Sequence, residues 1–208
     1  MTTKTTVTKK TPTAKVVKAT TSKPKASVEK PIPDLPNNPF VFEILNVVCN
    51  QRSNAKKIEA LQKYEHPCLK TLFIWNFDES VISMLPSGDV PYAGLDEQNS
   101  FSGTLGEKIE DAVSKMEEIG TNSLGSQDQG RSSIRKEYQR FYNFVKGGND
   151  SLSSLRRETM FINVLQGLHP LEAEILILVK DKKLQTKYKI TQDIISLAYP
   201  DIQWGGRS

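Results

Sequence analysis

One pattern occurs twice in this sequence and constrains its fold more than any other feature. A helical stretch ends in a His-Pro pair and leads into a second, more apolar stretch, first from Ile58 to Asp78 and again from Ile162 to Asp181. With one residue inserted, the copies align Leu61-Gln62 with Leu165-Gln166, His66-Pro67 with His169-Pro170, Leu72 with Ile175, Ile74 with Ile177 and Asp78 with Asp181. A residue before proline is kept out of the α region, whereas proline suits the first position of a helix. Each His-Pro pair therefore predicts a sharp turn between two helices.

The remaining apolar residues are also spaced as in helices, and no stretch shows the two-residue alternation of a strand. We expect an all-α fold, a compact bundle of about seven or eight helices built from two similar helix-HisPro-helix halves. Leu171–Val179 is apolar on nearly every side, so it is expected to be the central buried helix, with Lys180-Asp-Lys-Lys as its solvated end.

Capping residues predict where several helices begin. Pro39 is expected to open the first helix and Ser53 to cap the second. Asp78 is expected to cap one or two further turns over Glu79–Leu85, and Thr191 to cap the last helix.

Two predictions concern the stretch before the second His-Pro pair. A long helix is expected from residues 132–133 onward, because its apolar residues follow helical spacing: Ile134, Tyr138, Phe141, Tyr142 and Val145. Ser151 is expected to cap the helix that follows, with Leu155 facing inward and Arg156 and Arg157 facing outward.

The first 36 residues have the composition of a disordered tail, rich in Thr, Lys, Ser, Ala and Pro. Residues 1–35 carry a net charge of +6 and the remainder −2, so the basic character of the chain belongs to the tail. Such a polycation suits weak, salt-sensitive, non-specific contact with nucleic acid; the alternative is a solubilising tail or linker. The candidate contacts are Lys4, Lys9, Lys10, Lys15, Lys18, Lys23, Lys25 and Lys30.

The helical domain is expected to span residues 37–204, with 99–131 as a flexible insertion that contains one amphipathic helix. Residues 83–99 are rich in proline and glycine, and a long loop in a compact domain is often functional. This loop is therefore a candidate contact surface, although a packed connector is the alternative. The candidate partner-binding residues are Pro86, Asp89, Pro91, Tyr92, Arg156 and Arg157.

Two cysteines and two histidines raise the question of a metal site. Cys49, Cys68, His66 and His169 show none of the ligand spacings of zinc sites, and both cysteines stand in apolar segments, where thiols are reduced and inert. No nucleophile elbow or phosphate-binding loop is present, and Glu172 and Glu174 are two apart on a helix, so they point in different directions. We expect no cofactor, no metal and no enzymatic activity.

Leu171–Lys180 and Thr191–Tyr199 are candidates for the two helices of a helix-turn-helix. The linker of residues 181–190 is longer than the turn of that motif, and the second helix carries no Arg or Lys, which argues against sequence-specific DNA binding. Lys182, Lys183, Lys187 and Lys189 nonetheless make the linker basic. No apolar run is long enough to span a bilayer and the N-terminus lacks a secretory apolar region, so we expect a soluble protein that stays where it is made.

Several blocks of the sequence resemble a family of uncharacterised proteins of tailed bacteriophages, of the type found in phages of cyanobacteria. These blocks are Phe77-Asp-Glu-Ser-Val-Ile-Ser-Met-Leu-Pro-Ser-Gly-Asp-Val-Pro-Tyr92, Phe144-Val-Lys-Gly-Gly148, Arg157-Glu-Thr-Met-Phe161, Leu168-His-Pro-Leu-Glu-Ala-Glu174 and Val179-Lys-Asp-Lys-Lys-Leu184. The resemblance covers about residues 37–204 without the insertion. It implies a phage product made in a bacterial cytoplasm, and the family offers no catalytic residues to transfer.

These observations favour a non-enzymatic phage accessory protein that contacts another protein of the phage or host. The alternatives are a nucleic-acid-binding factor of phage replication or transcription and a minor component of the virion.

Overall fold

The computed structural model describes residues 1–2, 31–88, 90, 107, 110, 114 and 132–207. Contacts divide the chain into Met1–Pro31 and Ile32–Ser208, and the second unit is described below. The described part of this unit contains eight α-helices and one 3₁₀ helix, with a single isolated β-bridge and no strand, so the all-α prediction is confirmed. The eight candidate tail lysines and most of the insertion lie outside the described residues; Glu107, Glu110 and Ser114 are helical and exposed.

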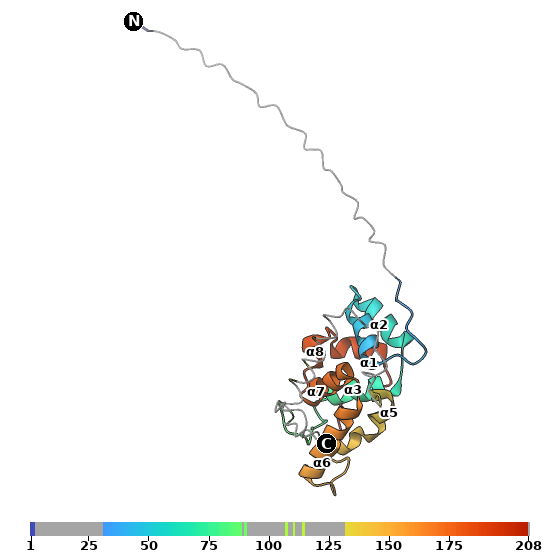
Figure 1. Cartoon of the computed structure of the whole chain (residues 1–208). Coiled ribbons are helices and arrows are strands. Elements are labelled where there is room, and N and C mark those ends of the chain that lie inside the picture. Colours follow the sequence, from blue (N-terminus) through green and yellow to red (C-terminus); the bar gives the residue numbers. More distant parts are fainter. Residues whose placement is uncertain are drawn as a thin grey trace. The chain divides into compact units, whose positions relative to one another are not determined.

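Two helices, α3 and α7, pack on each other at the centre of the described unit, and the others surround them (Figure 1). α1 and α6 also pack on α7, while α2 packs on α1 and α9. The helices are α1 (Val41–Cys49), α2 (Asn54–Lys63), α3 (Pro67–Phe77), α5 (Ile134–Glu137), the 3₁₀ helix η1 (Tyr138–Phe144), α6 (Ser154–Gly167), α7 (Pro170–Lys180), α8 (Leu184–Lys187) and α9 (Gln192–Ala198). None of the described helices is long and apolar enough to cross a membrane.

Both His-Pro pairs form the predicted turns, and each histidine caps the helix that follows. Nδ1 of His66 accepts a hydrogen bond from the Cys68 N–H (3.2 Å), and Nδ1 of His169 accepts one from the Leu171 N–H (3.1 Å). In each case the proline stands at the start of the helix, where its missing N–H costs nothing. The turns are confirmed, while the similarity of the two halves stays a prediction.

The central helix α7 is apolar on most sides, but it also carries Glu172 into the core. This side chain is fully buried, and its two oxygens accept hydrogen bonds from the N–H groups of Val41 (3.0 Å) and Ile134 (2.8 Å). These are the first residues of α1 and α5, so one carboxylate satisfies an otherwise unpaired donor at the start of two helices. Glu172 thereby fixes α1 and α5 on α7.

The long helix predicted from residues 132–133 is wrong beyond its first turn. The chain forms α5 and then η1, in which the buried rings of Phe141 and Phe144 follow Tyr138 at intervals of three residues. A 3₁₀ helix has three residues per turn, so this spacing places the aromatic side chains on one face, whereas an α-helix would rotate them apart. Tyr142, predicted to face the core, is exposed.

The further helical turns predicted over Glu79–Leu85 are also wrong. Asp78 is the C-cap of α3, a turn at Glu79 and Ser80 follows, and the chain then runs extended from Val81, with Val81 and Leu85 buried and Ile82 and Met84 exposed. The extended segment is held by backbone bonds from the Met84 N–H to the Phe144 carbonyl (2.8 Å) and from the Lys146 N–H to the Ile82 carbonyl (2.9 Å). Pairing with a segment 60 or more residues away decides the conformation here, which local capping signals do not reveal.

The start of α6 differs from the prediction in three ways. Ser153 is the cap instead of Ser151, and its hydroxyl accepts the Arg156 N–H. This shift of two residues rotates the helix, so Leu155 is 76% exposed and Arg157 is only 3% exposed. Arg157 therefore lies in the interior and is no part of a partner-binding surface.

The compact unit begins at Ile32, before the predicted boundary at residue 37. Ile32 and Leu35 pack against the core, and the Leu35 N–H donates to the Tyr64 hydroxyl (3.1 Å). Composition alone assigns these proline-rich residues to the tail, because the core against which Ile32 and Leu35 pack is formed by later parts of the chain.

Candidate binding groove at the end of α7

A groove of about 310 Å³ lies where the segment after α3 meets the turn after α7. One wall contains Ser83, Leu85, Ser87 and Gly88, and the other is the turn of residues 180–183. We call it the basic groove, because the second wall carries three lysines against one aspartate.

Lys180 and Asp181 hold the two walls of the basic groove together. The side chain of Lys180 is almost completely buried, and Nζ donates to the carbonyls of Pro86 (2.8 Å) and Gly88 (2.9 Å) and to Oδ1 of Asp181 (2.5 Å). The Gly88 N–H in turn approaches both oxygens of Asp181 at 3.3 and 3.4 Å. An ammonium has three protons, and all three have an acceptor here. A buried charge pair therefore holds the loop at residues 86–88 on the end of α7. Removal of either partner would leave the other charge buried and uncompensated.

The turn after α7 places Lys182 in a backbone conformation that is uncommon for lysine. Its φ is +56°, and its N–H donates to the Val179 carbonyl (3.1 Å) while the Lys183 N–H donates to the Leu178 carbonyl (2.7 Å). This is the Schellman pattern of helix ends, in which glycine usually occupies the left-handed position. A lysine at this position costs about 1 kcal/mol of backbone strain.

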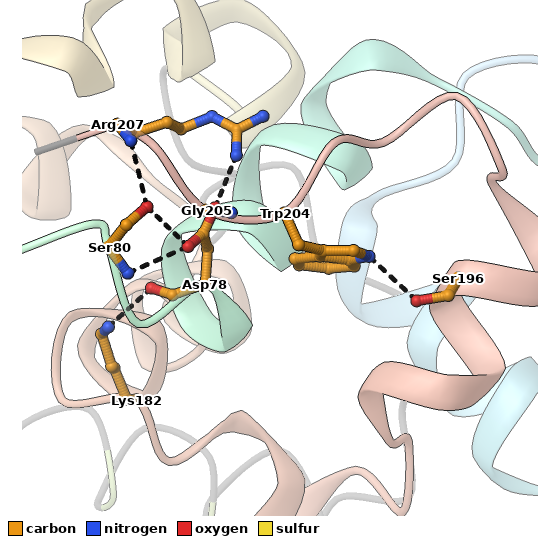
Figure 2. Close-up of polar contacts among 7 residues, drawn as sticks. All are labelled: Asp78, Ser80, Lys182, Ser196, Trp204, Gly205 and Arg207. Atoms are coloured by element: carbon orange, nitrogen blue, oxygen red, sulfur yellow. Dashed lines mark hydrogen bonds and ion pairs between the residues drawn. The ribbon is translucent and has the colours of Figure 1, made fainter.

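The ammonium of Lys182, which lines the groove, donates one hydrogen bond to the main-chain carbonyl of Asp78 (2.8 Å; Figure 2). The Asp78 carboxylate is buried and accepts from the N–H (2.9 Å) and hydroxyl (2.7 Å) of Ser80, from the Gly205 N–H (2.9 Å) and from the Arg207 guanidinium (2.5 Å). Burial by itself raises the pKa of Asp78, but these hydrogen bonds outweigh it and lower the pKa below its ordinary value.

The C-terminal segment is thus tied to the end of α3. Trp204 is half-buried, and its Nε1 donates to the Ser196 hydroxyl on α9 (2.9 Å; Figure 2). Hydrogen bonds of Asp78 and Trp204 hold residues 204–207 on α3 and α9. They also fix the position of Asp78, whose main-chain carbonyl accepts a hydrogen bond from Lys182.

The candidate partner-binding residues have different positions. Pro86 is exposed beside the groove and Arg156 is exposed on α6, whereas Arg157 is buried. Its guanidinium donates to the carbonyls of Asn143 (2.8 Å), Asn149 (2.9 Å) and Leu152 (3.1 Å). Asp89, Pro91 and Tyr92 lie outside the described residues.

Sequence reasoning missed Lys180 and Asp181 and assigned them to a solvated helix end. The alignment of Asp181 with Asp78 was a usable signal, because both acids follow an apolar helix and both accept main-chain N–H groups. Of the four linker lysines, Lys182 and Lys183 line the groove, while Lys187 is paired with Glu174 (2.5 Å).

Of the candidate metal ligands and catalytic groups, His66 and His169 cap helices and Glu172 accepts hydrogen bonds in the core. No three His, Cys, Asp or Glu side chains among the described residues gather so that they could hold a metal ion. Burial raises the pKa of the Cys68 thiol to about 12, which keeps it protonated at neutral pH. Burial also lowers the pKa of His66, with help from the charge of Arg135.

The two helices considered for a helix-turn-helix, α7 and α9, are not joined by the short turn of that motif. α8 stands between α7 and α9, and the exposed residues of α9 are Gln192, Asp193 and Leu197, which offer no cation to a phosphate.

A family of unknown function, DUF6433, matches residues 44–116 and 106–186. The chain belongs to this family. Both walls of the basic groove fall inside the matched residues, whereas the C-terminal segment at 204–207 falls outside them. No match is found among curated proteins or solved structures.

Proposed function

We propose that this protein is a non-enzymatic accessory protein that acts by binding another protein, and that the basic groove with its exposed rim is the contact surface. On the basis of the resemblance described above, we propose that it is a product of a tailed bacteriophage of the cyanobacterial type and acts in the host cytoplasm. The tail lysines add weak, non-specific affinity for nucleic acid. A minor role in the virion is the alternative location.

The observation that carries this proposal is a groove with hydrogen-bonded walls beside exposed apolar side chains. Ile82 and Met84 are 45% and 40% exposed, and they flank Ser83, which lines the groove. The backbone that carries them is fixed by its bonds to Phe144 and Lys146, and the loop beyond is fixed by Lys180. A contact surface that is already ordered loses less conformational entropy when a partner binds.

Site-specific photo-cross-linking tests this proposal. A photoreactive phenylalanine analogue replaces Met84 in cells that produce the protein, and the same analogue at Leu155 or Leu197 is the control, since these apolar residues are even more exposed, at 76% and 66%. We expect a discrete protein adduct from Met84 that Lys183→Glu abolishes, and none from the two controls. No adduct at Met84, or equal adducts at all three positions, contradicts a partner-binding groove.

A further inference from the structure

The extended segment that forms one wall of the groove has an unpaired edge. Ser83 lies opposite Val145 in an antiparallel bridge whose two hydrogen bonds are made by the flanking residues, Met84 and Ile82. In such a pair, the N–H and carbonyl of the central residue point away from the partner segment. The main-chain N–H and carbonyl of Ser83 accordingly have no hydrogen-bond partner among the residues that the structure describes.

The same edge continues to Leu85. Backbone groups two residues apart in an extended chain point in one direction, and the Leu85 N–H likewise has no acceptor within the described residues. Both Ser83 and Leu85 line the groove. One wall therefore presents a short row of main-chain donors and acceptors, and beside it the side chains of Ile82 and Met84 are exposed.

The opposite wall supplies positive charge. Lys180 is saturated and its charge is balanced by Asp181, but Lys182 uses one of its protons on a neutral carbonyl. Lys183 is exposed, and its ammonium has no ion pair with any side chain that the structure describes. The ammonium groups of Lys182 and Lys183 thus line a groove whose one carboxylate, that of Asp181, is already bonded to Lys180.

We propose that the basic groove binds an extended, acidic segment of a partner protein, which adds as a strand along Ser83–Leu85 and directs carboxylates to Lys182 and Lys183. This inference rests on the proposed function, to which it adds the chemistry of the partner. Main-chain bonds to an open strand edge give affinity, and alternate side chains of the added strand give specificity. Apolar side chains of the segment would contact Ile82 and Met84.

The charge and shape of the groove favour an acidic peptide over a nucleic acid. A nucleic acid presents phosphates and bases but no backbone that can pair with a strand edge, and its unpaired bases are usually stacked on aromatic rings or arginine. The groove lining contains neither residue type.

A short fluorescein-labelled peptide of alternating valine and glutamate is the probe, and fluorescence anisotropy at low salt measures its binding to the full chain. We expect Lys183→Glu to weaken binding about tenfold or more and Lys136→Glu, an exposed lysine on α5, to leave it unchanged. A peptide of alternating valine and lysine should bind the Lys183→Glu chain better than the natural one.

N-methylation of alternate peptide amides tests the strand geometry without changing the protein. Methyl groups on one edge of the peptide should abolish binding, while those on the other edge should have no effect. No binding of either peptide, equal effects on both edges, or a Lys183→Glu chain that binds as well as the natural one overturns the proposal. An equal loss of DNA binding by Lys183→Glu also overturns it, since the groove would then take phosphates. If Met84 cross-links to a protein through a segment that is not acidic, this inference fails while the proposed function stands.

Discussion

Glu172 is the buried carboxylate on which the positions of two helices depend. Burial raises its pKa to about 7, and this effect outweighs the hydrogen bonds from Val41 and Ile134 and the charge of Arg135, all of which favour the ionised form. At neutral pH the group is therefore close to half protonated in the folded chain, while in the unfolded chain it is ionised.

The raised pKa predicts how stability depends on pH. Between the ordinary value of 4.5 and about 7, the folded chain binds more protons at Glu172 than the unfolded chain does. The stability linked to this group is thus fully present below pH 4.5 and is lost as pH rises through 7. The total effect is about 3 kcal/mol.

Chemical denaturation of Glu172→Gln across this pH range measures the effect. Glutamine offers one oxygen and an NH₂ donor where the carboxyl group offers two oxygens, so one of the two helix starts loses its acceptor and the variant is less stable at low pH. In this variant, however, the free energy of unfolding should no longer decrease as the pH rises from 4.5 to 7. Glu174→Gln is the matched control, because Glu174 stands on the same helix but pairs with Lys187 at the surface. An unchanged decline in Glu172→Gln would show that another group titrates.

The sequence predicts residue environments well where an apolar pattern is regular and poorly where a charged side chain is buried. His66 and His169 could be assigned to turns because the following proline restricts their backbone. Glu172, Lys180 and Arg157 could not, because their acceptors and donors come from segments remote in sequence, or from a loop whose course is not encoded by spacing.

At the scale of elements, the buried Arg157 joins α6 to the loop that follows η1. Its guanidinium donates hydrogen bonds to the carbonyls of Asn143, Asn149 and Leu152 and so satisfies acceptors in this loop. The loop also leaves no room beside the Tyr142 carbonyl, since a side chain on Gly148 would stand 1.8 Å from that oxygen. The backbone of η1 and the start of α6 is therefore held by one guanidinium.

Arg157→Met should lower the free energy of unfolding by about 3 kcal/mol, because it removes a charged donor from three carbonyls, of which the Asn143 carbonyl is buried. The neighbouring Arg156→Met is the control and should change stability by less than about 0.5 kcal/mol, since Arg156 is exposed. Urea denaturation followed by circular dichroism measures both. Equal effects of the two substitutions would mean that the bonds of Arg157 add nothing.

The elements that the sequence predicts correctly are those whose apolar period is unbroken, such as α2, α3 and α7. Residues 79–85 and η1 depart from prediction for a common reason. The two segments bond to each other through the Met84 N–H and the Phe144 carbonyl. Local sequence patterns do not contain such distant partners, so neither conformation can be predicted from its own segment.

The bond from the Met84 N–H to the Phe144 carbonyl is what couples those two segments. It joins residues that are far apart in the chain, whereas helix periodicity and capping rules consider only neighbours. One wall of the basic groove is held by this pairing of Met84 with Phe144. The sequence therefore identifies the loop near Pro86 as a candidate surface, but it does not identify the opposite wall at residues 180–183.

At the scale of the whole molecule, positive charge is concentrated in the part of the sequence that precedes the compact unit. Residues 1–35 carry +6 and the remainder −2, yet the compact unit already begins at Ile32. The eight tail lysines all precede that residue. Affinity for nucleic acid and stability of the helical unit should therefore be separable by truncation at Pro31.

Two truncations test this separation. A chain that starts at Ile32 should unfold at the same urea concentration as the full chain, while its binding to random DNA at low salt should be lost with the eight lysines. A chain that starts at residue 37 should be less stable by about 2 kcal/mol, because it also loses the apolar contacts of Ile32 and Leu35. Urea denaturation and DNA anisotropy titrations on the three chains measure both properties. Tight, sequence-selective DNA binding by the chain that starts at Ile32 would contradict the accessory role and favour a nucleic-acid-binding factor, because the tail lysines could not supply it.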